Sequence, residues 1–86
     1  VLGATDGRLP AARYAVQVGS FADADNAERL RRRLESHFEE VFVSVLEADA
    51  GRYHRVRLGP FDRRETAVAQ ARSAEDLGLP AVVVEE

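Results

Sequence analysis

The chain has 86 residues, enough for one small domain, and its 45% hydrophobic and 31% charged residues are typical of a globular protein. The formal net charge of −3 argues against non-specific nucleic-acid binding, which needs a basic surface. The absence of cysteine excludes disulfides, thiolate metal sites and a cysteine nucleophile.

The first twelve residues contain two glycines, a proline and no periodicity. We therefore expect the end of a flexible linker over residues 1–12 and one folded domain over residues 13–86. Because the chain begins at Val1 rather than Met, we expect it to be a piece of a longer protein. No run approaches the ~18 apolar residues of a membrane helix, so we expect this domain to make no membrane contact.

The first half of the folded part predicts a strand followed by a helix. Residues 13–19 alternate, which places Tyr14, Val16 and Val18 on one side of a strand and Ala15, Gln17 and Gly19 on the other. After a turn at 20–22, the capping-box spacing of Asp25 and Glu28 predicts a helix that begins near residues 23–25. The apolar stripe of this helix is expected to be Ala27, Leu30, Leu34 and Phe38.

The second half begins with a predicted hairpin. A strand over 41–46 has Val41, Val43 and Val45 on its buried side and Phe42, Ser44 and Leu46 on the other. A loop at 48–51 leads into a central strand that buries Val56 and Leu58 and carries Tyr53, Arg55 and Arg57 on its polar side. Asp62 and Glu65 repeat the capping-box spacing, and the helix they open is expected to end at Leu77, before a last strand over 81–85.

The chain repeats itself after forty residues. The motif VGSF at 18–21 returns as LGPF at 58–61, and Ala27 returns as Ala67. Two strand–helix–strand units predict an α+β, ferredoxin-like β-α-β-β-α-β fold. Its four-stranded antiparallel sheet has two helices on one face and the first and third strands at its centre. The face without helices is then expected to carry Gln17, Tyr53, Arg55 and Arg57.

We considered an enzyme and an RNA-binding domain first. His37 and His54 have no serine, aspartate or glutamate partner in an identifiable motif, and the acidic pairs 39–40 and 85–86 lie at element ends. We expect no catalytic residue, no metal and no cofactor. An RNA-recognition module needs an internal glycine and more aromatic residues on its third strand. This chain has RYHRVRLG there, with one aromatic and no internal glycine, so we expect no nucleic-acid partner.

Two binding functions stay open on the residues alone. Sugars are held by planar amide and guanidinium groups together with an aromatic ring, and Gln17, Ser20, Tyr53 and Arg55 supply that set. The two arginines could instead only solvate an exposed face. Alternatively, the open face or an edge strand could serve dimerisation or protein docking, with an apolar patch made of Phe42, Leu46 and Val83.

The sequence resembles a SPOR domain (sporulation-related repeat). The resemblance rests on YAVQVGSF at 14–21 with the helix opening ADADNAERLRRRL, on YHRVRLGPF at 53–61, and on GLPAVVV at 78–84. It implies a non-catalytic, monomeric module that binds denuded peptidoglycan, from which amidases have removed the stem peptides. It also implies a periplasmic location at the division septum, as part of a cell-division protein or of a rare-lipoprotein-A type lytic transglycosylase.

The resemblance also implies which residues bind glycan. The family's glutamine and serine fall on Gln17 and Ser20, its strand-three aromatic on Tyr53, where many members have tryptophan, and its following arginine on Arg55. An apolar residue of the last strand falls on Val83. Stem-peptide removal frees a lactyl carboxylate on every second sugar, and Arg55 and Arg57 are expected to pair with successive carboxylates.

Overall fold

The computed structural model describes residues 13–85, so the linker predicted for residues 1–12 lies outside the described residues. The elements follow the expected β-α-β-β-α-β order. They are β1 (Tyr14–Phe21), α2 (Ala24–Leu34), β2 (Val41–Ala48), β3 (Gly51–Phe61), α3 (Arg64–Asp76) and β4 (Val82–Glu85).

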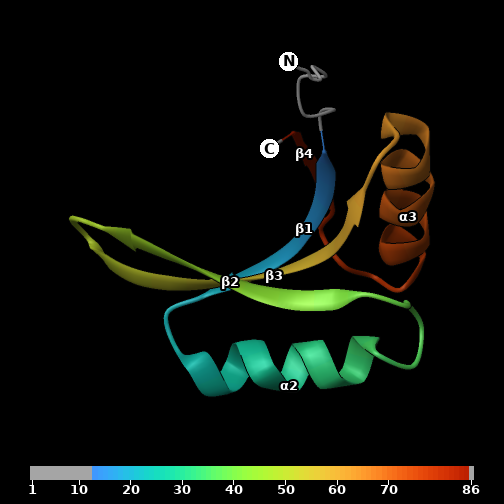
Figure 1. Cartoon of the computed structure of the whole chain (residues 1–86). Helices are drawn as coiled ribbons and strands as arrows, with labels where there is room; N and C mark the ends of the chain where they lie inside the picture. The colour runs from blue at the N-terminus through green and yellow to red at the C-terminus, as the bar shows by residue number, and fades with distance from the viewer. Residues whose placement is uncertain (1–12, 86) are drawn as a thin grey trace, which may run out of the picture.

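The four strands form one antiparallel sheet in the order β2-β3-β1-β4, so the central position predicted for β1 and β3 is confirmed. The sheet is curved, and both helices lie on its outer, convex side (Figure 1). Helix α2 packs against β1, β2 and β3, while α3 packs against β1, β3 and β4. Among the described residues no helix covers the inner, concave side.

The core lies between the sheet and the two helices. Alternate residues of the central strands face the helices, and each helix contributes one stripe of apolar residues at spacings of three and four. The buried cluster consists of Val16, Val18, Ala27, Leu34, Phe38, Val56, Leu58, Ala67, Ala71 and Ala74. Alanines on α3 bring that helix close to the sheet, because their side chains occupy little space between the two backbones.

Strand β1 contains a bulge that the sequence did not predict. Gln17 lies opposite Arg57, but Gly19 lies opposite Val56 and Ser20 opposite Arg55, so β1 has one extra residue in this stretch. The bulge turns Gly19 toward the helices, and its predicted place beside Gln17 is wrong. It also puts Ser20 on the same face as Gln17, although two residues lie between them and regular alternation would place them on opposite faces.

The helix ends differ from the sequence prediction. Helix α2 begins within the expected range, but its N-cap is Asp23, whose Oδ1 accepts a hydrogen bond from the backbone N–H of Asp25 at 2.8 Å. Glu28 therefore closes no capping box with Asp25. The N-cap of α3 is Arg63, with no side-chain cap bond, so the second predicted capping box is also wrong.

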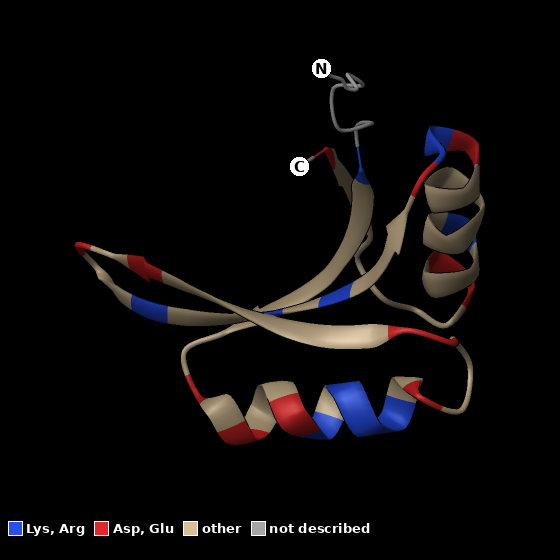
Figure 2. Ribbon diagram, viewed as in Figure 1, with Lys and Arg blue, Asp and Glu red and all other residues tan. Residues whose placement is uncertain are grey.

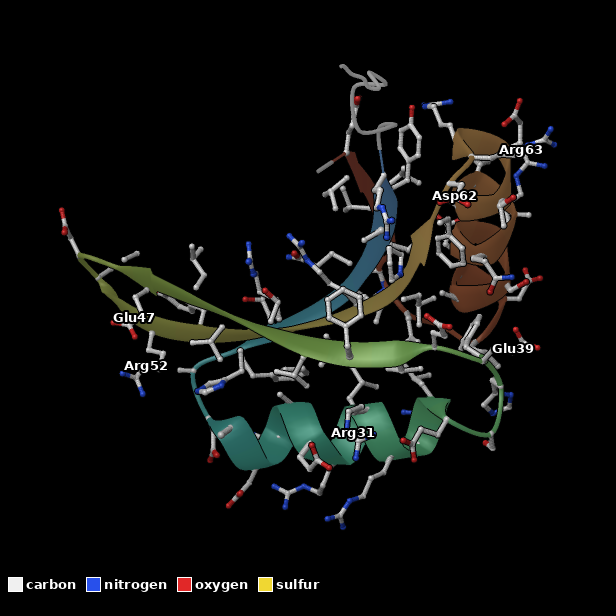
Figure 3. All side chains as sticks on the ribbon, in the orientation of Figure 1. Arg31, Glu39, Glu47, Arg52, Asp62 and Arg63 are labelled. Carbon is white, nitrogen blue, oxygen red and sulfur yellow. The ribbon has the colours of Figure 1, made fainter. Side chains whose placement is uncertain are left out.

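The β2–β3 hairpin is regular along its whole length. The strands pair from Val41 opposite Leu58 to Ala48 opposite Gly51, which leaves a two-residue connection. Its outer half extends beyond the helices (Figure 1), and Val45 and Leu46 there are 50% and 42% exposed. Glu47 and Arg52 project from this outer half (Figure 3) and form an ion pair at 3.2 Å.

Candidate functional site

The concave side of the sheet brings together the polar side chains of three neighbouring strands. We call it the open face and define it by the strand register as Gln17, Ser20, Phe42, Ser44, Leu46, Tyr53, Arg55, Arg57 and Val82. These residues form rows across the sheet: Arg57 lies between Gln17 and Phe42, and Arg55 lies between Ser20 and Ser44. Five of the six residues predicted to bind glycan lie on this face.

The open face carries positive charge and no carboxylate. Arg55 and Arg57 lie on β3 where it pairs with both β1 and β2, whereas the acidic residues of the strands lie near the strand ends and the hairpin tip (Figure 2). Although the overall charge is −3, Arg55 and Arg57 make the middle of the open face basic. An anionic ligand that lies across the sheet meets arginine side chains first, which favours its approach.

Arg57 is the most deeply placed charged residue of the open face. The residue is only 9% exposed. Its guanidinium donates hydrogen bonds from Nε and Nη2 to Oε1 of Gln17, at 3.2 and 3.1 Å. The two residues lie directly opposite each other on β1 and β3. A buried guanidinium needs such partners, because its desolvation otherwise costs several kcal/mol.

Arg55 is half-buried and more accessible than Arg57. Its Nη2 donates to Oγ of Ser44 at 3.0 Å. Its Nε is shielded from solvent and has no hydrogen-bond partner among the described residues. Only one other N–H of this guanidinium bonds to a described residue, so an acceptor on a ligand could use the Nη donors that remain.

Tyr53 lies at the outer end of the open face, half-buried and opposite Leu46 on β2. Strand β1 ends before this point, since its last residue, Phe21, pairs with His54. Tyr53 therefore has a cross-strand neighbour on one side only. On the other side no strand of the described sheet pairs with Tyr53, and the ring of a sugar could lie against Tyr53 there.

Val83 does not lie on the open face, and that part of the prediction is wrong. It pairs with Val16 and packs against the buried cluster under the helices. Its neighbour Val82 pairs with Gln17 and is 58% exposed, so Val82 is the residue that β4 contributes to the open face. Val83 therefore does not join Phe42 and Leu46 in the apolar patch that was expected on the open face.

The structure adds Ser44 and Val82 to the candidate site, and neither was among the residues predicted to bind glycan. Alternation along β2 placed Ser44 on the correct side, but its contact with Arg55 depends on the pairing of β2 with β3, which the sequence does not specify. For Val82 the sequence carried no signal, because residues 81–84 are all apolar and show no alternation.

The groups with shifted acidity lie on α2, on the other side of the sheet from the open face (Figure 3). Hydrogen bonds from the Arg31 guanidinium, at 3.0 and 2.5 Å, lower the pKa of the Glu28 carboxyl from 4.5 to about 2. Glu35 also accepts a hydrogen bond from Arg31, and together the two carboxylates raise the pKa of that guanidinium. This network stabilises the helix and is remote from the open face.

Residues 13–85 contain no cluster of three or more histidine, aspartate and glutamate side chains suited to a metal ion. His37 is exposed and His54 is half-buried opposite Phe21, and no hydrogen bond links either one to a carboxylate in this range. Neither helix of the described part of the chain has the length and apolar character needed to cross a bilayer.

Comparison with known protein families and with solved structures identifies the same kind of domain. The model of the SPOR domain family matches residues 10–85. The crystal structure of the RlpA SPOR domain from Pseudomonas aeruginosa is similar, with 30% identity, a TM-score of 0.74, and coverage of 83% of this chain and 96% of that one. The solution structure of the peptidoglycan binding domain of the B. subtilis cell wall lytic enzyme CwlC has 31% identity, a TM-score of 0.70, and coverage of 91% and 94%. A search of the curated proteins found no match.

Proposed function

This chain belongs to the SPOR domain family, and we propose that its open face binds peptidoglycan glycan strands from which the stem peptides have been removed. The module itself is a non-catalytic peptidoglycan-binding domain of the cell envelope. The narrower part of the proposal concerns which form of peptidoglycan it selects, which residues make the contacts, and where in the envelope the domain is enriched.

The observation that carries the proposal is the acid-free row around Arg55. In a denuded strand every second sugar has a free lactyl carboxylate, so the ligand is a regular polyanion. Arg55 stands between the hydroxyls of Ser20 and Ser44, and its guanidinium has donor capacity that the described residues leave unused. A carboxylate placed there accepts charge-assisted hydrogen bonds, which are about twice as strong as neutral ones.

Sugar recognition is assigned to the residues on either side of Arg55. Gln17 offers an amide, and Tyr53 offers a ring next to the end of β1. Val82, next to Gln17, adds an exposed apolar surface on β4 in the place where Val83 was expected. The ligand would then cross the strands from the Val82 end to the Tyr53 end and contact the carboxylate site in between.

We further propose that the domain is periplasmic, is enriched at the division septum and acts as a monomer. Denuded strands arise where amidases cut stem peptides, so a module that prefers them accumulates at the site of that cleavage. The similarity to the RlpA SPOR domain supports a parent protein of the rare-lipoprotein-A lytic transglycosylase type, and a cell-division protein is the other candidate. The module would deliver that parent protein to its substrate.

The test is sedimentation of the purified domain with peptidoglycan sacculi before and after amidase treatment. We expect binding to rise after treatment, and Arg55→Ala to weaken it about tenfold or more, the loss expected for a hydrogen bond to a charged group. The salt dependence of binding should also fall. Arg33→Ala is the matched control, since it removes the same charge from exposed α2 on the other side of the sheet.

Equal binding to treated and untreated sacculi would refute selection for denuded strands. An Arg55→Ala variant with wild-type affinity and salt response would refute the electrostatic contact. No binding to either kind of sacculus would contradict peptidoglycan binding by this surface.

Protein docking is the second candidate, and one observation favours it. The outer half of the β2–β3 hairpin exposes Val45 and Leu46, and β2 is an edge strand whose outer side pairs with no other strand of the described sheet. If this edge mediates self-association, sedimentation velocity will show a species that grows with concentration and that is lost in Val45→Lys. A monomer at all concentrations would exclude it.

A further inference from the structure

We infer that Arg57 is a positioning residue that fixes the orientation of the Gln17 amide, so that Gln17 offers only hydrogen-bond donors to a ligand. The inference rests on the proposed glycan binding and concerns the polarity of that site. It gives Arg57 a role other than the carboxylate contact expected from the sequence, because Arg57 would act on the ligand through Gln17.

Arg57 holds the Gln17 amide with two hydrogen bonds. Two nitrogens of Arg57, Nε and Nη2, donate to the same oxygen of Gln17, at 3.2 and 3.1 Å. An arginine side chain has five N–H donors and no acceptor. If the amide were turned by half a rotation, its NH₂ group would face these donors and both bonds would be lost. The chemistry of the pair therefore permits only one orientation of the Gln17 amide.

Arg57 makes this contact from a buried position. The residue is 9% exposed and lies in the middle of the sheet, paired across the strands with Gln17 on one side and Phe42 on the other. Turning the amide oxygen away would be strongly unfavourable, because the buried guanidinium would lose two hydrogen bonds where water has little access. Binding energy of one ligand group is too small to turn the amide around.

A ligand on the open face meets the Nε2 group of the Gln17 amide. Both Arg57 bonds go to Oε1, so the Nε2 group of Gln17 presents its two N–H donors. This group makes no hydrogen bond to another described residue. Arg55, in the next row of the open face, is also purely a donor. The centre of the site therefore selects acceptor oxygens, such as the carboxylate or acetamido carbonyl of an amino sugar. A ligand hydroxyl can bind Gln17 and Arg55 only as an acceptor.

The experiment uses Gln17→Glu, which preserves shape and the contact with Arg57 but replaces two donors with a charged acceptor. For denuded glycan with intact carboxylates we expect at least about a tenfold loss of affinity, the effect of losing one hydrogen bond and gaining repulsion. For the same glycan with its carboxylates reduced to alcohols, we expect a much smaller loss, since hydroxyls can donate to the new carboxylate. Equal losses for the two ligands, or none, would overturn the inference.

A second measurement uses the side-chain NH₂ resonances of Gln17 in ¹⁵N–¹H spectra of the wild-type domain. We expect them to shift on addition of denuded glycan, because the ligand accepts from Nε2. In Arg57→Lys, which keeps the charge but loses the two-pronged donor, these resonances should lose their distinct position and affinity should fall. If wild-type domain binds glycan but the Gln17 resonances do not move, the inference is wrong. If wild-type domain binds no glycan, the proposed function is what fails.

Discussion

Gly19 links the stability of the fold to the geometry of the site, and replacing it with alanine tests that link. Gly19 follows the β1 bulge and faces the helices, opposite Val56. A Cβ built at this position would lie 2.8 Å from Cε2 of Phe21 and 3.0 Å from Cδ2 of Leu30. Real side chains do not approach so closely, so one or both neighbours must move.

The loss of unfolding free energy in Gly19→Ala depends on which side chains have to move. Overpacking a core usually costs about 1–3 kcal/mol. Phe21 and Leu30 are only partly buried, and the clashing atoms lie at the far ends of their side chains, so we expect the lower part of the range, about 1–2 kcal/mol. For a domain of this size each kcal/mol lowers the melting temperature by roughly 4–8 °C. Gly19→Ala should therefore melt about 5–15 °C below the wild type.

The assay is thermal and urea unfolding followed by circular dichroism, with Ser20→Ala as the matched control. Ser20 is the exposed neighbour of Gly19 but faces the opposite side of the sheet, toward Arg55. Its replacement should leave stability within about 0.5 kcal/mol of wild type, while weakening glycan binding. If Gly19→Ala is as stable as the wild type, or if Ser20→Ala is the more destabilising of the two, then the bulge does not orient these residues as described.

Two further predictions concern the last strand and helix α2. Val82→Asp should weaken glycan binding and leave the fold stable, whereas Val83→Asp should destabilise the domain because it places a charge beside Val16. Unfolding and sacculus sedimentation of both variants test this prediction. The reverse order of effects would contradict the assignment of Val82 to the open face and Val83 to the core side. The pKa of Glu28, lowered from 4.5 to about 2 by Arg31, means that its ionised form stabilises the fold above about pH 4.5, and that this contribution disappears as the pH falls toward 2. The difference in unfolding free energy between wild type and Glu28→Gln should therefore favour the wild type at neutral pH and vanish over that window, and a difference independent of pH would refute it.

The sequence predicted the fold because its patterns are redundant. Alternation along β3 and along the first part of β1 identifies the buried residues Val16, Val56 and Leu58, and helical spacing identifies Ala27 and Leu34 independently. The forty-residue repeat then limits the topology to a few arrangements. An error in one element does not change the result, since the other elements specify the same core.

The site was harder to predict because it depends on register. A bulge shifts every later residue of β1 by one place, and nothing in the alternation of residues 13–19 indicates where it lies. On β4, three consecutive valines conform to either phase, so only the pairing with β1 distinguishes Val82 from Val83. The bond between Arg57 and Gln17 joins residues forty positions apart and follows from the same register.

The repeated Gly-x-Phe motif has a structural reason that connects these observations. A Cβ on Gly19 would meet the ring of Phe21, and a Cβ on Gly59 would lie 3.0 Å from the ring of Phe61, so in both halves the phenyl ring folds back over the glycine two residues earlier. Both rings then pack against the common core. Because the ring must reach the helix side at each place, the residue between glycine and phenylalanine points the other way. In the first half that residue is Ser20, and the packing of Phe21 thereby places the hydroxyl of Ser20 on the open face opposite Arg55.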